Sequence, residues 1–192
     1  MSAHAVAPVI ASEAAGAIRL VIFDVDGVLT DAGVYIGATA AGESVELKRW
    51  DIQDGVGLKM LKWAGLDVVL VSGRVSESTT LRAREIGVEC HQEPDAQKVP
   101  VVEALLEEKG IDWSEVAMLG DDIPDLAVLR RVGFPAAVLN ATPVVRGLAR
   151  WVSTKRGGHG AAREFSDAIL AARGQLEHVV ERYVAERAVS RR

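Results

Sequence analysis

Short apolar runs recur along the chain, and the segments between them carry apolar residues at every third or fourth position. The runs are Leu20–Phe23, Val68–Val71, Val116–Leu119 and Ala136–Leu139. A strand that is apolar on both faces is typical of a parallel sheet covered by helices on both sides. The pattern therefore predicts at least four buried parallel strands.

Helical periodicity fills the segments between these runs. The predicted helices cover Gly57–Ala64, Ser76–Ile86, Val99–Lys109 and Ile123–Val132. Gly110 and Gly133 follow the last two of them, in the position where a glycine commonly ends a helix. Strands that alternate with helices predict right-handed crossovers, and so an α/β fold with a doubly wound parallel sheet.

Three segments stand outside this alternation. Val34–Trp50 contains a glycine-bearing loop between two strand-like stretches and predicts a small β-hairpin inserted after the first strand. Gln175–Arg187 has apolar residues at helical spacing and predicts a terminal helix. Residues 1–19 lack the pattern of a signal peptide, and we interpret them as a flexible leader. The domain is then expected over residues 20–172, with a helical extension over residues 173–192.

Composition narrows the class of protein. The 192 residues suit one compact domain, and an apolar share of 49% excludes a chain that is disordered along its length. A net charge of −5 argues against nucleic-acid binding, which needs a basic surface. No apolar run is long enough to cross a membrane. The cytoplasm is the default location, and the single cysteine, Cys90, excludes an internal disulfide bond.

Polar side chains follow three of the predicted strands at the point where each strand ends. They are Asp24 and Asp26, then Ser72 and Arg74, then Asp121 and Asp122. Ligands of open α/β sheets bind outside the carboxyl ends of the strands, so we expect these groups to meet in one site. Lys98, at the start of the third predicted helix, can join them.

The chemistry of this set points to phosphoryl transfer. Clustered carboxylates repel one another unless a cation lies between them, and all-oxygen ligands favour Mg²⁺. The hydroxyl, guanidinium and ammonium groups of Ser72, Arg74 and Lys98 are donors suited to a phosphate. One carboxylate can attack phosphorus and form an aspartyl-phosphate, and a second can protonate the leaving alcohol and then activate water.

Four motifs resemble those of the haloacid dehalogenase superfamily in order and strand context: DVDGVLT from Asp24, Ser72 in VSGR, Lys98, and GDDIPD from Gly120. The resemblance implies that Asp24 is the nucleophile and Asp26 the general acid and base. It also implies that Ser72 and Lys98 hold the phosphoryl group, and that Asp24, the Asp26 carbonyl and Asp121 bind Mg²⁺. Asp122 is either close to the metal or a helix cap. Asp125 either supports the site or is a first-turn acid that the helix dipole stabilises.

A narrower resemblance covers residues 20–172, which are similar to the cap-less 3-deoxy-D-manno-octulosonate 8-phosphate phosphatase family. It rests on Tyr35-Ile36-Gly37, on Asp54-Gly55-Val56-Gly57, on Arg82 and Gln92, and on GGHGAARE from Gly157 to Glu164. It implies a phosphorylated sugar acid as substrate, lipopolysaccharide synthesis as the pathway, and a homotetramer whose hairpin and C-terminal tail close a neighbour's site. The implied substrate-binding residues are Asp51, Ile52, Gln53, Asp54, Gly55, Lys59, Arg74, Arg82 and Lys98.

The chain departs from that family's pattern at a few positions. Ser72 stands where threonine is more usual, and Lys59 stands where arginine is common, which changes the geometry of carboxylate recognition. Two other functions stay open: a phosphatase of a nine-carbon sugar acid 9-phosphate, and a non-catalytic oligomerisation protein. The intact set of Asp24, Asp26, Lys98 and Asp121 argues against the second. The glycine-rich segment at 157–160 is interpreted as flexible.

Overall fold

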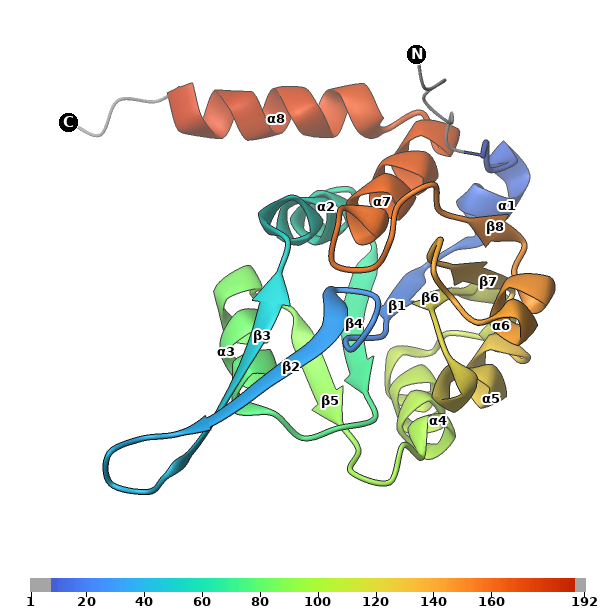
Figure 1. Cartoon of the computed structure of the whole chain (residues 1–192). Helices are drawn as coiled ribbons and strands as arrows, with labels where there is room; N and C mark the ends of the chain where they lie inside the picture. Colours follow the sequence, from blue (N-terminus) through green and yellow to red (C-terminus); the bar gives the residue numbers. More distant parts are fainter. Residues whose placement is uncertain (1–7, 189–192) are drawn as a thin grey trace, which may run out of the picture.

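The computed structural model describes residues 8–188 and has a six-stranded parallel sheet at its centre (Figure 1). The strand order is β5-β4-β1-β6-β7-β8, which confirms the doubly wound α/β fold. The strands are β1 (Leu20–Phe23), β4 (Asp67–Ser72), β5 (Glu89–Gln92), β6 (Val116–Gly120), β7 (Phe134–Ala137) and β8 (Trp151–Val152).

A separate antiparallel hairpin, β2 (Thr30–Ala38) with β3 (Ser44–Trp50), follows β1 and projects from the body of the molecule (Figure 1). This confirms the predicted hairpin. Its bounds are wider than the predicted Val34–Trp50, because β2 already begins at Thr30 and pairs there with Trp50.

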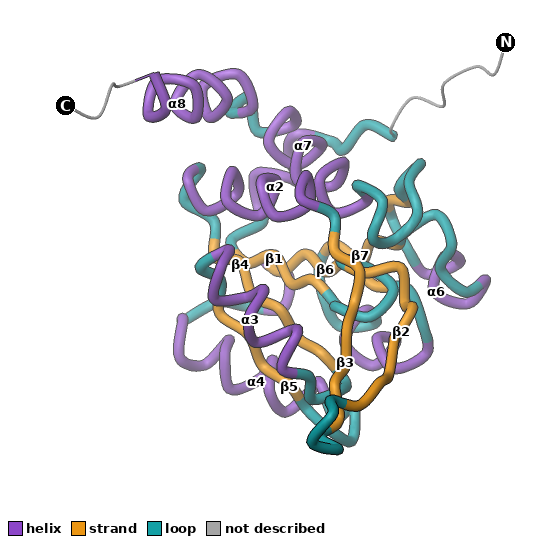
Figure 2. The backbone as a smooth tube through the Cα atoms, turned by 60° about the vertical axis from the view of Figure 1, so that its left-hand side comes forward, coloured by secondary structure: helices purple, strands orange, loops and turns teal. Residues whose placement is uncertain are grey.

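Helices cover both faces of the sheet. They are α1 (Ser12–Ala17), α2 (Ile52–Trp63), α3 (Glu77–Ile86), α4 (Lys98–Lys109), α5 (Leu126–Leu129), α6 (Pro143–Leu148), α7 (Ala161–Ala172) and α8 (Leu176–Ala188), with short 3-10 turns at Trp113–Glu115 and Ile123–Asp125. In Figures 1 and 2, α2 and α7 lie together on one face and α4 lies on the other. No helix among residues 8–188 has the length and apolarity needed to cross a membrane.

Phe165 anchors α7 to the sheet. Its ring is fully buried and lies 5.0 Å from the Trp151 ring and 6.2 Å from the Phe23 ring, measured between centroids. Aromatic pairs at such distances add to the stability that burial alone provides. The helix α7 is not among the elements predicted from the sequence, although its apolar residues have helical spacing. This helix brings the segment that precedes it close to the end of β1.

The other predicted elements match the structure with three differences. The helix predicted from Gly57 begins earlier, at Ile52. Gly55 and Gly57 have low helix propensity, and the prediction therefore started too late. Their small size lets α2 pack closely, since a Cβ on Gly57 would lie 3.0 Å from Arg163 Cα. The strand predicted at Ala136–Leu139 lies two residues earlier. The helix predicted over Ile123–Val132 is broken into a 3-10 turn and the short α5.

The structure also differs from the predicted leader over residues 1–19. Within the described part of that segment, Ile10, Ala15 and Ile18 are buried in the core. The Arg173 guanidinium donates to the carbonyl of Ala15 at 2.7 Å and to that of Ile18 at 3.0 Å. Residues 10–18 therefore belong to the folded domain, because α1 packs on α7, whose buried face is mostly apolar. Residues 1–7 lie outside the described part, and so do residues 189–192 of the predicted C-terminal extension.

Candidate active site

The carboxyl ends of β1, β4 and β6 form a cleft of about 200 Å³. Its lining includes Asp24, Asp26, Gly73, Arg74, Ala96, Lys98, Asp121, Asp122 and Asp125. The expectation that polar groups from separate strand ends meet in one place is confirmed for these residues. The parallel sheet produces this convergence, because its strands all end at the same edge.

A buried lysine lies between two buried carboxylates at the floor of the cleft. The Lys98 ammonium is 2.5 Å from Asp24 Oδ1 and 2.6 Å from Asp125 Oδ1. The second oxygen of Asp125 accepts from the backbone N–H of Asp121 at 2.9 Å. Asp125 therefore orients both Lys98 and the loop after β6, and it is more than a first-turn acid favoured by the helix dipole.

Burial shifts the acidity of these groups. Desolvation raises the pKa of the Asp24 carboxyl to about 7, although the charge of Lys98 acts against it. Desolvation, with the neighbouring Asp24 carboxyl, raises the pKa of Asp121 to about 8. Burial alone would lower the pKa of Lys98, but the charges of Asp24 and Asp125 outweigh it and raise that pKa. Lys98 is therefore a permanent cation in a cleft where the pKa values of Asp24 and Asp121 lie near neutral pH.

The acidic groups suit a hard divalent cation. Carboxylate oxygens of Asp24, Asp121 and Asp125 all lie within 4.8 Å of one another, and oxygen donors of this kind favour Mg²⁺. Asp121 can occupy this position only because residue 27 is a glycine: a Cβ on Gly27 would lie 2.1 Å from Asp121 Oδ2. Both oxygens of Asp125 are engaged, Oδ1 with Lys98 and Oδ2 with the backbone N–H of Asp121, whereas Lys98 holds only Oδ1 of Asp24. Asp24 and Asp121 are therefore the better ligands. The role of the Asp26 carbonyl as a further ligand stays a prediction.

Mg²⁺ affinity is expected to rise with pH between about pH 6 and about pH 9, because the cation must displace the protons on Asp24 and Asp121. Each proton displaced changes the affinity by up to about tenfold per pH unit. Isothermal titration calorimetry in two buffers of different ionisation enthalpy would measure both the affinity and the proton release. Asp95→Asn, in the exposed loop before α4, should leave this dependence unchanged. A flat affinity over this range would contradict the assignment.

The same shifts set the stability of the metal-free protein. The Asp121 pKa of about 8 lies above the ordinary value of 3.8, so the folded state binds more protons than the unfolded state over that interval. The free energy of unfolding of the metal-free protein should then fall as the pH rises from about 4 to about 8. Mg²⁺ should stabilise the protein most at the upper end of this pH range.

Asp26 has a partner that the sequence analysis missed. The side chain of Lys48, on β3, is fully buried, and its ammonium lies 2.8 Å from Asp26 Oδ1 and 3.1 Å from Asp26 Oδ2. It also donates to the Thr79 hydroxyl at 3.2 Å. No local signal marks Lys48, because a lysine in a hairpin is usually solvated. It is buried only because the hairpin packs against α3 and the loop after β1.

Ser72 is buried next to the cleft, but its hydroxyl is engaged with backbone. It donates to the carbonyl of Arg74 at 3.0 Å and accepts from the N–H of the same residue at 3.2 Å. The hydroxyl must therefore turn to reach a phosphoryl oxygen. Asp122 lines the cleft and accepts from the N–H of Ile123 at 2.8 Å, which establishes the helix-cap alternative. Its contact with a metal stays a prediction.

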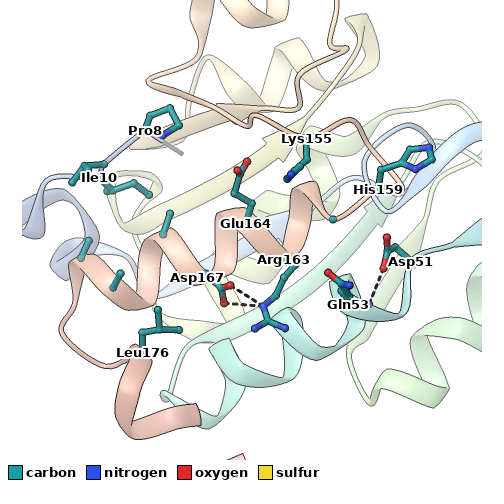
Figure 3. Close-up of a pocket in the computed structure, with 15 residues that line it drawn as sticks. Pro8, Ile10, Asp51, Gln53, Lys155, His159, Arg163, Glu164, Asp167 and Leu176 are labelled. Atoms are coloured by element: carbon teal, nitrogen blue, oxygen red, sulfur yellow. Dashed lines mark hydrogen bonds and ion pairs between the residues drawn. The ribbon is translucent and has the colours of Figure 1, made fainter. Parts of the chain in front are cut away.

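Of the nine predicted substrate-binding residues, Arg74 and Lys98 lie in the Asp24 cleft. The Arg74 guanidinium is 3.0 Å from Glu46 Oε2 and 4.0 Å from Asp26 Oδ1. Asp51 and Gln53 instead line a larger cavity of about 730 Å³ along α7 (Figure 3). A third cavity of about 90 Å³, next to α8, is lined by Ile52, Gly55, Lys59 and Arg82. Within a single chain these residues therefore line separate cavities, because the start of α2 faces α7 and α8, and their contact with the substrate stays a prediction.

Asp54 has a structural role, which corrects its assignment to the substrate. Its side chain is buried, and Oδ1 accepts from the backbone N–H of Arg163, in the first turn of α7, at 2.7 Å. Burial raises the pKa of this carboxyl to about 6. Asp54 therefore ties α2 to the start of α7, and a substrate does not reach it in this arrangement.

The glycine-rich segment before α7 is closely packed, although its composition predicted flexibility. A Cβ on Gly157 would lie 1.6 Å from the carbonyl oxygen of Gly27, and one on Gly158 would lie 2.4 Å from the N atom of Asp31. Gly158 also has a φ of +66°, which favours glycine. These glycines let the segment lie directly against the loop that carries Asp24.

Comparison with known proteins identifies the family. A family model described as haloacid dehalogenase-like hydrolase matches residues 91–165. The 3-deoxy-D-manno-octulosonate 8-phosphate phosphatase of Yersinia pestis is 35% identical over 160 residues, which cover 83% of each chain. The enzyme of the same name from Escherichia coli K12 is 36% identical over the same share.

Solved structures agree with this relationship. The phosphatase of the same name from Moraxella catarrhalis, in complex with magnesium, phosphate and its sugar acid, has a TM-score of 0.82 and 32% identity, covering 90% of this chain and 97% of its own. A probable phosphatase from Pseudomonas syringae has a TM-score of 0.82 and 41% identity, covering 90% and 96%. With the cleft described above, these relationships show that the chain is a phosphoric monoester hydrolase and belongs to the 3-deoxy-D-manno-octulosonate 8-phosphate phosphatase family of haloacid dehalogenase-like hydrolases.

Proposed function

We propose that this chain hydrolyses 3-deoxy-D-manno-octulosonate 8-phosphate to the free sugar acid and inorganic phosphate. The observation that carries the proposal is the buried contact of Lys98 with Asp24 and Asp125, at 2.5 and 2.6 Å, beside the acidic group of Asp121. That arrangement offers a carboxylate nucleophile next to a fixed cation. The substrate class follows from the names of the relatives that match 83% of the chain at 35 and 36% identity.

In the first step, a carboxylate oxygen of Asp24 attacks phosphorus while the bond from phosphorus to the sugar oxygen breaks. Asp26 gives its proton to the departing sugar oxygen, and an aspartyl-phosphate remains on Asp24. In the second step Asp26 takes a proton from water, whose oxygen attacks phosphorus and releases inorganic phosphate and the Asp24 carboxylate. Lys98 faces the charge that develops on the phosphoryl oxygens throughout.

Asp24 and Asp121 would hold Mg²⁺, which would supply further positive charge to stabilise the phosphoryl group. Arg74 adds a partly exposed guanidinium at the mouth of the cleft, where its side chain is 45% exposed. Beside its contact with Glu46 at 3.0 Å, the guanidinium has exposed N–H groups that suit the carboxylate or the phosphate of a sugar acid.

Phosphate release from 3-deoxy-D-manno-octulosonate 8-phosphate, with and without Mg²⁺, tests the proposal against a panel of sugar phosphates that includes a nine-carbon sugar acid 9-phosphate. A strong Mg²⁺-dependent preference for the eight-carbon ester supports it. A preference for the nine-carbon ester would replace the substrate and keep the chemistry. No release from any ester would favour the non-catalytic oligomerisation protein.

We further propose a homotetramer in which neighbouring subunits close each site. The hairpin that projects from the body of the molecule (Figure 1) carries exposed apolar side chains at Tyr35 (61%), Ile36 (77%) and Leu47 (61%). Such side chains suit a contact with a second copy. Asp51 and Gln53 line the cavity along α7 and not the Asp24 cleft of their own chain, and we propose that they serve a neighbouring subunit. A cytoplasmic location also stays a prediction.

Ile36→Asp is expected to shift the protein to smaller species and to lower kcat/KM by more than about tenfold. A charge in place of an apolar anchor costs about 2 kcal/mol or more at an interface. Light scattering coupled to gel filtration, together with phosphate release, would measure both effects. Val144→Asp, at an exposed position of α6, is the matched control. An unchanged mass for the Ile36 variant would argue against the hairpin as the contact.

A further inference from the structure

Lys48 is a buried cation for which the proposed reaction has as yet no role. It lies on β3, and its side chain has no exposed surface. Its ammonium lies within hydrogen-bond distance of Asp26 and of the Thr79 hydroxyl, and 3.7 Å from Glu46 Oε1. The contacts join three separate elements: the hairpin, the loop after β1, and α3.

Stability alone does not account for such a lysine. Removing an ammonium from water costs several kcal/mol, and a well-packed apolar side chain of similar volume is often as stable or more so. Glu46 is shared, because its Oε2 lies 3.0 Å from the Arg74 guanidinium. The carboxyl group that Lys48 contacts through both oxygens is that of Asp26.

The contact fixes a side chain that would otherwise rotate. Asp26 is 20% exposed at the cleft, and its Oδ1 is buried with no partner that meets hydrogen-bond geometry, although Lys48 lies 2.8 Å away. Of the two oxygens, Oδ2 accepts the hydrogen bond from Lys48. A group that must deliver a proton to one atom and later remove one from water gains from a single orientation.

We propose that Lys48 is a positioning residue for the proton transfers of Asp26, with Thr79 holding the ammonium in place. The inference rests on the proposed function, in which Asp26 is the general acid and base. Because Lys48 lies on the hairpin, the hairpin contributes directly to the orientation of the acid, in addition to any role in contact between subunits.

Lys48→Met tests this, since methionine keeps an unbranched apolar stem and removes the ammonium. Departure of a sugar alcohol needs the acid, whereas p-nitrophenolate leaves without protonation. We expect kcat on the sugar phosphate to fall about 10²-fold, in the range of general acid catalysis. The single-turnover burst of p-nitrophenolate from p-nitrophenyl phosphate should change by less than about threefold, because that step does not use the acid.

Asp26→Asn should show the same dependence of activity on the leaving group. In the double variant, Lys48→Met should lower the activity of Asp26→Asn little further, because the two substitutions remove the same function. Thr79→Val keeps the test valid if Lys48→Met does not fold, and it should show a weaker form of the same pattern. Lys62→Met, at an exposed position of α2, is the control.

The outcomes separate the two proposals. If Lys48→Met loses the burst and the sugar phosphatase activity equally, or keeps both, the inference is overturned while the proposed function stands. If Asp26→Asn itself shows no dependence on the leaving group, the acid role of Asp26 fails and the inference fails with it. A wild-type chain that releases no phosphate from any ester overturns the proposed function first.

Discussion

Asp24→Asn is expected to lower phosphate release by about 10⁴- to 10⁶-fold, as loss of a nucleophile does in other hydrolases, and to leave the fold intact. An amide nitrogen or oxygen does not form the aspartyl-phosphate, whereas asparagine has nearly the same volume as aspartate. Phosphate release at saturating Mg²⁺ measures the loss, and thermal unfolding measures the stability. The Asp24 carboxylate accepts a hydrogen bond from the buried Lys98 ammonium. The amide oxygen of asparagine can accept the same bond, which helps the variant to keep the fold.

Asp95→Asn makes the same chemical change in the exposed loop before α4 and is expected to retain full activity. Turnover retained in the Asp24 variant would mean that another group attacks phosphorus. In that case Asp24 would be reassigned as a metal ligand only, and Asp26 would be the next candidate nucleophile.

Lys98→Met is expected to lower kcat by about 10²- to 10³-fold and to destabilise the protein by about 3–5 kcal/mol. The Lys98 side chain is 2% exposed and separates two buried carboxyls, so its loss leaves their charges without compensation. Urea unfolding in the absence of Mg²⁺ measures the stability, and phosphate release measures the activity. Lys62→Met, on the exposed face of α2, is expected to change neither.

A second substitution separates the two effects of Lys98. Asp125→Asn, added to Lys98→Met, removes one of the uncompensated carboxyls and should recover part of the stability but none of the activity. If stability and activity returned together, the role of Lys98 would be structural, and the proposed stabilisation of the phosphoryl group would have to be abandoned.

The buried strands and the central chemistry could be predicted from the sequence, because both are encoded locally. A continuous apolar run such as Leu20–Phe23 is typical of a strand that is buried on both faces of a parallel sheet. Asp24 and Asp121 directly follow such runs, so their meeting at one edge follows from the parallel order of the strands. Lys98 is buried beside them as the first residue of α4.

The predictions failed where the partner of a residue is distant in the chain. Asp54 was assigned to the substrate, yet it accepts a hydrogen bond from Arg163. The segment at 157–160 was interpreted as flexible, yet its glycines allow close packing on the loop after β1. Composition alone does not distinguish a glycine needed for mobility from one needed for close approach.

The sequence by itself therefore determined the four central strands of the sheet, the acidic cluster with its lysine, and the chemistry that these allow, whereas the edge strands β5 and β8 were not predicted. The tertiary structure alone decided that Lys48 is buried against Asp26, and that Asp51 and Gln53 face α7 while Arg74 faces the cleft. The physical reason is that periodicity reports whether a residue is buried along its own element. The partner of a buried polar group is set by how elements far apart in the chain pack together.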